Sequence, residues 1–211
     1  MRSAWRASAA AVVALMVLGA RAEAASIIFD DVSRLDFFSN RAAGNSPLAD
    51  ITVSAATVIT EIGVYNDLTA DGNLKFLIFN LDTNTLLFQS ATQAFVDNGA
   101  SFKLSNVFAP FVLLPGVNYG IGAIADVAAG WGINNSSGGN PFTQNGITAS
   151  DDRNGNVSNF AAPALGAEGT AMIIVQLGND AAPTAVPEPG TLVLLGSAAA
   201  WMVRRRRASG R

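Results

Sequence analysis

Oxygen-rich side chains that could bind a cation gather in two short loops. In the loop DDRNGN the candidate ligands are Asp151, Asp152, Asn154 and Asn156. Carboxylate and amide oxygens suit calcium, so this loop predicts a structural calcium site, although the EF-hand spacing and its terminal glutamate are missing. The loop NDLTADGN, with Asp67, Asp71 and Asn73, offers the same chemistry. For both loops the alternative is a solvated turn, because Asp, Asn and Gly also favour turns.

Catalytic groups are scarce in this chain. The sequence contains no histidine and no cysteine, which removes the commonest general base near neutral pH and the thiolate nucleophile. A glycosidase would need two facing carboxylates, but most acidic residues fall in predicted turns and no pair can be named. We therefore expect a protein that is not an enzyme and that needs no cofactor apart from the candidate calcium.

Aromatic side chains could instead stack on sugar rings. Trp131 in GWGINN and Tyr119 in VNYGIG are the two residues that we consider for this role. The alternative for both is packing in the core, because an aromatic side chain buries a large apolar area.

The tail VPEPGTLVLLGSAAAWMVRRRR combines three kinds of residue. Pro187 and Pro189 flank Glu188, so no helix can continue back into the body and an accessible extended step is expected there. The apolar run 191–203 would span about 20 Å as a helix, against a hydrocarbon core of about 30 Å. Four arginines follow and would hold the end of the run at the cytoplasmic face. This design favours a transient membrane hold during export, and the alternative is a permanent inner-membrane anchor.

This three-part pattern closely resembles the PEP-CTERM sorting signal of Gram-negative bacteria. The residues that carry the resemblance are Pro187, Glu188, Pro189, Arg204, Arg205, Arg206 and Arg207. The resemblance implies export, recognition by a membrane protease called an exosortase, cleavage near the Pro-Glu-Pro step, and release or attachment at the cell surface. Bacteria with this system generally make exopolysaccharide and biofilm matrix. Similar tails are catalogued as the C-terminal segment of ice-binding proteins, but many unrelated bodies share them, so the tail does not predict ice binding.

The N-terminal segment has the layout of a secretory signal peptide. Two arginines precede an apolar run, and small residues in an A-x-A arrangement follow it. We expect signal peptidase to cleave after Ala24, with Ala22 and Ala24 in the two small pockets; cleavage after Ala22 is the second choice, and an uncleaved anchor is the alternative interpretation.

Charge separates the two ends of the chain from its middle. Eight of the 13 basic residues lie before residue 25 or after residue 203, whereas residues 25–186 hold 14 acidic and five basic residues, a net charge of −9. Nucleic-acid binding depends on clustered Lys and Arg. The acidic body therefore excludes a nucleic-acid partner.

Short β-branched and aromatic stretches, divided by Gly, Asn, Asp and Pro, predict an all-β body. The predicted strands are 26–29, 49–53, 57–66, 74–80, 85–92, 101–106, 108–113, 117–125, 130–134 and 169–178. Ten short strands with this spacing indicate an antiparallel β-sandwich. The polar stretch 134–161 is expected to form long loops with one strand, near 143–149.

Alternation along two of these strands predicts which faces are buried. In LKFLIFN, apolar residues occupy both faces, so we expect the strand 74–80 to be buried on both sides. In SFKLSN, Phe102 and Leu104 are expected to point inward and Ser101, Lys103 and Ser105 outward, as on a sheet with one wet face.

The middle of the body resembles a family of small extracellular jelly-roll sandwiches of unknown function, the DUF4082-like domains. The resemblance covers residues 50–125 and follows the stretches ITEIGVYNDLTADGNLKFLIFNLDTNTLLFQSAT and FAPFVLLPGVNYGIGA. It implies a jelly-roll-like sandwich and no particular activity.

We thus expect five segments: a signal peptide at 1–24, a β-sandwich at 25–180, a linker with the Pro-Glu-Pro step at 181–190, a transmembrane-like helix at 191–203 and a basic cytoplasmic tail at 204–211. The expected function is that of an exosortase-processed surface or matrix protein with a structural or adhesive role in the exopolysaccharide layer. The alternative is a carbohydrate-binding module with a discrete sugar site, for which polysaccharide is the partner.

Overall fold

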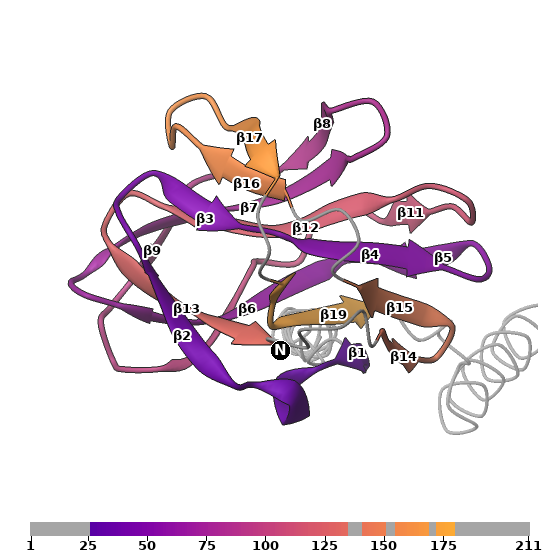
Figure 1. Cartoon of the computed structure of the whole chain (residues 1–211), viewed down its shortest axis with the longest axis horizontal. Helices are drawn as coiled ribbons and strands as arrows, with labels where there is room; N and C mark the ends of the chain where they lie inside the picture. The colour runs from indigo at the N-terminus through magenta and orange to yellow at the C-terminus, as the bar shows by residue number, and fades with distance from the viewer. Residues whose placement is uncertain (1–25, 135–140, 151–154, 169–171, 180–211) are drawn as a thin grey trace, which may run out of the picture. The chain divides into compact units, whose positions relative to one another are not determined.

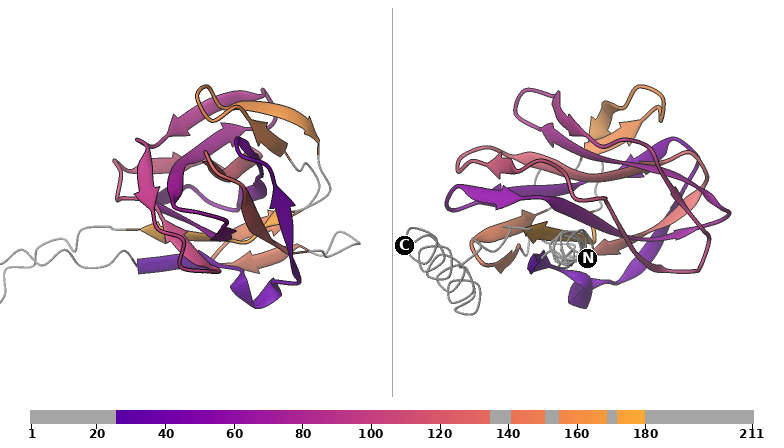
Figure 2. Two further views of the ribbon diagram at one scale, coloured as in Figure 1. Left: turned by 90° about the vertical axis from the view of Figure 1, so that its left-hand side faces the viewer. Right: turned by 180° about the vertical axis from the view of Figure 1, so that it is seen from behind.

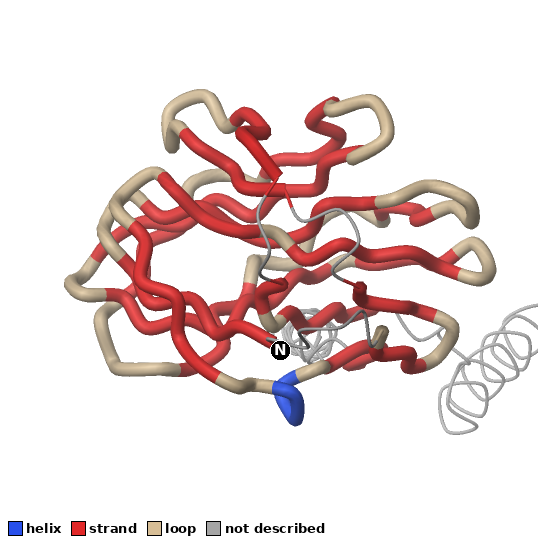
Figure 3. Tube along the Cα trace, in the orientation of Figure 1, coloured by secondary structure: helices blue, strands red, loops and turns tan. Residues whose placement is uncertain are grey.

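The computed structural model describes residues 26–134, 141–150, 155–168 and 172–179, which belong to one compact unit. These residues form 19 strands and one 3-10 turn, η1 (Val32–Arg34), the blue segment of Figure 3. The strand pairings among them are antiparallel. The all-β prediction is therefore confirmed. The expected signal peptide and C-terminal helix lie outside the described residues.

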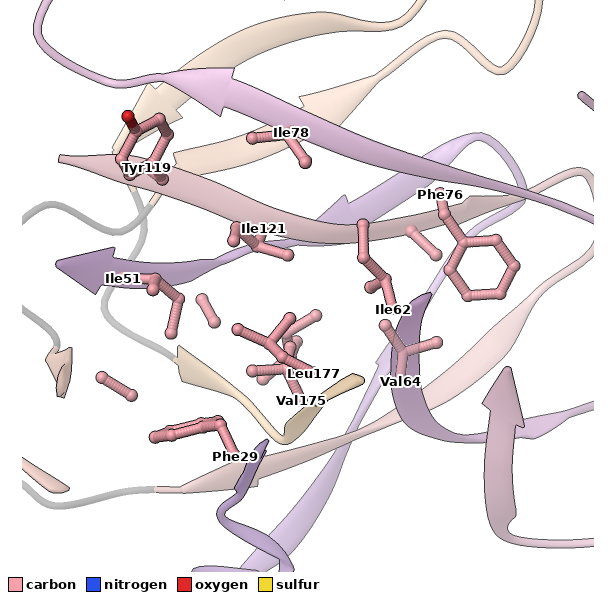
Figure 4. Packing of buried hydrophobic residues seen from close by; sticks show 14 of the residues in the cluster. Phe29, Ile51, Ile62, Val64, Phe76, Ile78, Tyr119, Ile121, Val175 and Leu177 are labelled. Atoms are coloured by element: carbon pink, nitrogen blue, oxygen red, sulfur yellow. The ribbon is translucent and has the colours of Figure 1, made fainter. Parts of the chain in front are cut away.

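Two sheets of seven strands each enclose the main core (Figure 1). The first sheet contains β1 (Ser26–Asp30), β2 (Phe37–Arg41), β6 (Glu61–Leu68), β10 (Ser101–Leu104), β13 (Ala129–Asn134), β18 (Met172–Ile173) and β19 (Val175–Asn179). The second contains β4 (Ala49–Val53), β7 (Gly72–Asn80), β8 (Thr85–Gln89), β9 (Gln93–Phe95), β12 (Tyr119–Ala125), β14 (Phe142–Gln144) and β15 (Ile147–Ser150). Side chains from both sheets, such as Val175 and Ile121, meet between them (Figure 4). This is the arrangement of a β-sandwich.

Two smaller sheets complete the described structure. β3 (Asn45–Pro47), β16 (Gly155–Ser158) and β17 (Ala164–Glu168) form a three-stranded sheet, and β5 (Thr57–Ile59) pairs with β11 (Phe111–Leu113). β16 and β17 lie at the top of Figure 1, beside β7 and β8; Figure 2 shows the same sheet from two other sides. The three-stranded sheet covers part of the second large sheet, because Leu48 and Val157 are buried in one cluster with Leu77, Phe79 and Ile124.

Strand β7 is buried on both faces, as its sequence predicted. Leu74, Phe76 and Ile78 lie in the main core, while Leu77 and Phe79 lie in the second cluster. The layer formed by β3, β16 and β17 explains why a strand of a two-sided sandwich needs no polar face.

Strand β10 contradicts the predicted faces. Lys103 is buried, with 4% of its surface exposed, whereas Leu104 is 41% exposed. The Lys103 ammonium donates to Asn98 Oδ1, to the Gly99 carbonyl oxygen at 3.3 Å and to Ser101 Oγ at 2.7 Å. These oxygens replace the water that a buried ammonium loses. The strand is therefore turned over relative to the prediction, and Phe102 lies on the outer face.

The described part of the stretch 134–161 contains more strands than predicted. β14 and β15 form a hairpin whose turn residues Asn145 and Gly146 have φ angles of 52° and 77°, as a two-residue turn of this kind requires. β16 lies between β3 and β17. A hairpin stands where one strand was expected near 143–149, and β16 was not predicted, because short polar strands carry little sequence signal of their own and depend on their neighbours.

The last strands of the domain insert between two others. β18 pairs with β13, and β19 pairs with β6 on one side and with β1 on the other. Between β18 and β19, Ile174 donates its N–H to the Gly132 carbonyl at 2.8 Å and accepts from the Tyr65 N–H at 3.1 Å. The segment of β18 and β19 therefore lies between β6 and β13 and is hydrogen-bonded to both strands.

Candidate functional site

The predicted calcium loop lies mostly outside the described residues. Asp151, Asp152 and Asn154 are not described, and Asn156 lies on β16, opposite Pro47 of β3. Calcium binding by this loop stays a prediction.

The other oxygen-rich loop uses its side chains to hold neighbouring turns. Asn73 donates from its backbone N–H to Asp126 Oδ1 and from Nδ2 to Asp126 Oδ2, each at 2.6 Å. Asp71 Oδ1 accepts from the Asp97 N–H at 2.9 Å. Asp67 is exposed on the outer face of β6. Among the described residues, no group of three or more Asp or Glu side chains is placed to hold a metal ion.

The two rings considered for sugar stacking belong to the core. Trp131 is fully buried and Tyr119, labelled at the start of β12 in Figure 4, is 3% exposed. The Tyr119 hydroxyl accepts from the Leu114 N–H at 2.9 Å, and its ring meets Phe111 edge to face with centroids 6.4 Å apart. Both residues thus have the packing role that was the alternative, and neither ring is open to a sugar in this fold.

Three other aromatic rings line up on the outer face of the first sheet, and we call Phe38, Tyr65 and Phe102 the aromatic platform. Tyr65 and Phe102 are direct partners on β6 and β10, and Phe38 is the partner of Gly132 on β13. The ring centroids of Phe38 and Tyr65 are 5.9 Å apart with an interplanar angle of 34°. Those of Tyr65 and Phe102 are 5.2 Å apart at 76°. Phe38 is 38% exposed, and the other two rings are half-buried.

Glycines beneath the aromatic platform allow its rings to pack closely against the sheet. β13 separates β2 from β6, so Phe38 and Tyr65 start about 10 Å apart, yet their centroids approach to 5.9 Å. A Cβ on Gly132 would lie 3.0 Å from Tyr65 Cδ1, and one on Gly130 would lie 3.5 Å from Phe38 Cδ1. Both rings therefore lean over β13, and Leu35 Cδ1, 2.9 Å from the same Gly132 position, shares the room that the missing side chains leave.

Polar groups flank the aromatic platform in the next row of the sheet. Gly130 has Asn40 of β2 on one side and Asp67 of β6 on the other, and both side chains are exposed. Asn40 lies two residues after Phe38, and Asp67 two residues after Tyr65, so these side chains share one face of the sheet. The outer face thus presents an apolar shelf with an amide and a carboxylate beside it.

A buried carboxyl group lies where β1 ends. Asp31 is fully buried, and its Oδ1 accepts from the Val175 N–H at 2.9 Å, so the side chain extends the ladder between β1 and β19. Its Oδ2 has no hydrogen-bond partner among the described residues. Burial raises the pKa of Asp31 from 3.8 to about 7; the Val175 N–H opposes this shift, and the nearby Asp30 adds to it.

Sequence reasoning missed the aromatic platform because it missed β2 and turned β10 over. A signal was nevertheless present: in AGWGIN the glycines 130 and 132 occupy alternate positions and so share one face of the strand. Two glycines on one face indicate that something large crosses that face. The partner rings could not be named without the strand pairing.

Comparison with known proteins identifies the tail of the chain. Residues 185–207 match the PEP-CTERM protein-sorting motif. No curated protein matches the chain. In the part of the chain that the structure describes, no helix is long and apolar enough to cross a membrane. The match supports an exported protein that is anchored at the membrane for sorting and is processed by an exosortase.

Proposed function

We propose that this protein is a non-enzymatic component of the extracellular polysaccharide layer, with a structural or adhesive role, delivered there by exosortase processing. The observation that carries the proposal is the sorting motif at 185–207 behind an acidic β-sandwich. Signal peptidase and an exosortase are its proposed processing partners. The final location on the cell surface or in the matrix of a Gram-negative bacterium is part of the same proposal.

The composition supports a non-enzymatic role. Without histidine and cysteine, the chain lacks the residues that most often act as base or nucleophile. A carbohydrate-binding module is the second candidate, and the partly exposed aromatic platform favours it, because surface rings rimmed by polar groups are typical of binding surfaces.

Processing is tested by changing the Pro-Glu-Pro step. Replacing Pro187, Glu188 and Pro189 by alanine should leave the chain in the inner-membrane fraction and reduce the surface and medium fractions at least tenfold. Pro183→Ala is the matched control, because it removes a proline just before the motif. Immunoblots of cell fractions give the readout. Equal surface amounts of the two variants would show that the motif does not direct this protein.

The matrix role is tested by removing the protein from the producing cells. Deletion should lower the cohesion of the polysaccharide layer, measured by rheology of the biofilm, and the intact gene should restore it. A gene in which an unrelated folded domain replaces residues 26–179 should not restore cohesion. If that hybrid restores it fully, the sandwich has no role in the matrix.

A further inference from the structure

We propose that the aromatic platform binds a chain of uncharged sugars, with pyranose rings lying on Phe38 and Tyr65. The proposal rests on the proposed function, because it names the ligand class that would hold the body in the polysaccharide layer. It also replaces the two buried rings that the sequence suggested by three rings that the fold presents at its surface.

The shape of the aromatic platform suits a sugar ring. Phe38 and Tyr65 are tilted by only 34° and lean over a glycine floor, so together they form a shallow shelf. Aromatic faces are electron-rich, and the C–H groups on one face of a pyranose are their complement. Phe102 stands edge-on to Tyr65, at 76°, and closes the shelf on the β10 side.

Hydrogen-bonding groups stand within one row of this shelf. Asn40 and Asp67 lie two residues along β2 and β6 from Phe38 and Tyr65, which is about 7 Å on the same face. An amide and a carboxylate can together donate to and accept from sugar hydroxyls. Apolar stacking with a few polar groups at its side is the usual division between affinity and orientation in a small-molecule site.

Charge selects uncharged sugars over acidic ones. The described residues hold four basic side chains. Arg34 lies over the Phe142 ring, Lys75 donates to the Phe160 carbonyl at 2.8 Å, and Lys103 is buried in its own loop. Arg41 lies opposite Ala129, on the other face of β2 from Phe38. None of these four therefore lies on the platform face, where Asp67 supplies negative charge.

A sugar chain fits the size of the aromatic platform better than a second copy of the protein. A stable protein interface buries roughly 800 Å² on each partner. Three aromatic side chains have about 150–250 Å² each when fully exposed, and these three are half-buried or, for Phe38, 38% exposed. With Leu104, which is 41% exposed on the same face as Phe102, as the one further apolar side chain of β10 there, the area on offer is that of a few sugar rings.

The proposal is tested by titrating the exported protein with four polymers. The uncharged probes are a β-glucan, a xyloglucan and a galactomannan, and alginate is the acidic comparison. Calorimetry should show saturable binding to at least one uncharged polymer and none to alginate. Phe38→Leu and Tyr65→Ala should each weaken that binding roughly tenfold, whereas Tyr65→Phe, which keeps the ring, should stay within about threefold.

Phe37→Ala is the matched control for the loss of a phenylalanine. Phe37 is 43% exposed, adjacent in sequence, and opposite Ile133, so it points to the other side of β2 from Phe38. The affinity of the Phe37→Ala variant for the uncharged polymer should remain within about twofold of that of the wild type. Phe38→Leu is used in place of alanine because it keeps an apolar cover on the glycine floor, and unchanged circular dichroism verifies the fold.

Three outcomes would overturn the assignment: no binding of the wild-type protein to any uncharged polymer, equal loss for Phe37→Ala and Phe38→Leu, or a platform variant that loses self-association and keeps sugar binding. A cell assay separates this proposal from the proposed function. If the wild-type protein binds sugar but is not retained in the matrix, the proposed function fails and the platform stands. If both platform variants are retained as well as wild type, the platform fails and the proposed function stands.

Discussion

Asp31 has acid–base chemistry that departs strongly from that of an ordinary aspartate. Its carboxyl group is fully buried and has one backbone donor, Val175, for two oxygens. Burial therefore raises its pKa to about 7, because the charged form loses more hydration than one hydrogen bond restores.

This shift makes the stability of the fold depend on pH in a defined direction. Below pH 4 the Asp31 carboxyl group is protonated in both the folded and the unfolded protein. Between about pH 4 and pH 7 the unfolded chain has lost the proton that the folded protein keeps, so the free energy of unfolding declines as the pH rises. The total decline is about 4 kcal/mol, at about 1.4 kcal/mol for each unit of pKa. Above pH 7 this residue causes no further change.

Asp31→Asn should raise the Tm at pH 8 by several degrees and leave it nearly unchanged at pH 4. The amide keeps an oxygen that can accept from Val175 and cannot ionise. Thermal unfolding followed by circular dichroism from pH 4 to pH 8 is the measurement, with Asp67→Asn, an exposed carboxyl group, as the control. Parallel pH profiles for wild type and Asp31→Asn would refute the buried-carboxylate explanation.

Among the elements, the β14–β15 hairpin depends on one turn. Gly146 has a φ angle of 77°, and a Cβ there would lie 2.6 Å from Ser54 Oγ. Gly146→Ala should destabilise the fold by about 1–2 kcal/mol, through the strained backbone and the displaced serine. Urea unfolding measures the change.

Gly116→Ala is the matched control for the hairpin. Gly116 has a φ angle of 79°, and nothing lies within 4 Å of an added Cβ. It carries the backbone cost alone, so its effect should be smaller than that of Gly146→Ala. Should the two changes cost the same, the contact with Ser54 is not restrictive.

The strands also show what could be predicted from the sequence. β7 was predicted correctly because apolar residues on both faces leave one interpretation, burial on both sides. β10 was not, because alternation separates two faces without naming the inner one. Lys103 could be placed inside only by knowing that Asn98, Gly99 and Ser101 fold back to bind its ammonium.

The sites follow the same division. The sorting motif is a local string, so its residues were all named from the sequence and the motif match confirms them as a PEP-CTERM segment. The aromatic platform joins residues 38, 65 and 102 across three strands. No spacing in the chain encodes that proximity, which exists only after β2, β13, β6 and β10 have paired.

At the scale of the whole molecule, the two ends of the described fold lie together. Ser26 of β1 is the direct partner of Asn179 of β19, and the two strands run side by side at the lower part of Figure 1. The sorting motif begins at residue 185, so five residues separate it in the sequence from the last described strand.

A circular permutant should therefore fold. Joining residue 179 to residue 26 by a short linker, with new ends between Thr83 and Asn84, should give a Tm within a few degrees of the unpermuted domain 26–179. The cut lies in an exposed turn between β7 and β8. New ends between Ile121 and Gly122, inside the buried strand β12, should abolish cooperative unfolding. If neither permutant folds, residues 179 and 26 cannot be joined by a short linker without loss of the fold.

The pairing of β1 with β19 also determines when the first sheet of the exported chain can be completed. The first strand to emerge has its partner among the last residues of the body, and β6 likewise waits for β19 along half of its length. The first sheet cannot close until residue 179 has left the export channel. A chain that stalls earlier exposes two open strand edges to its neighbours, so prompt completion of export is itself a safeguard against aggregation.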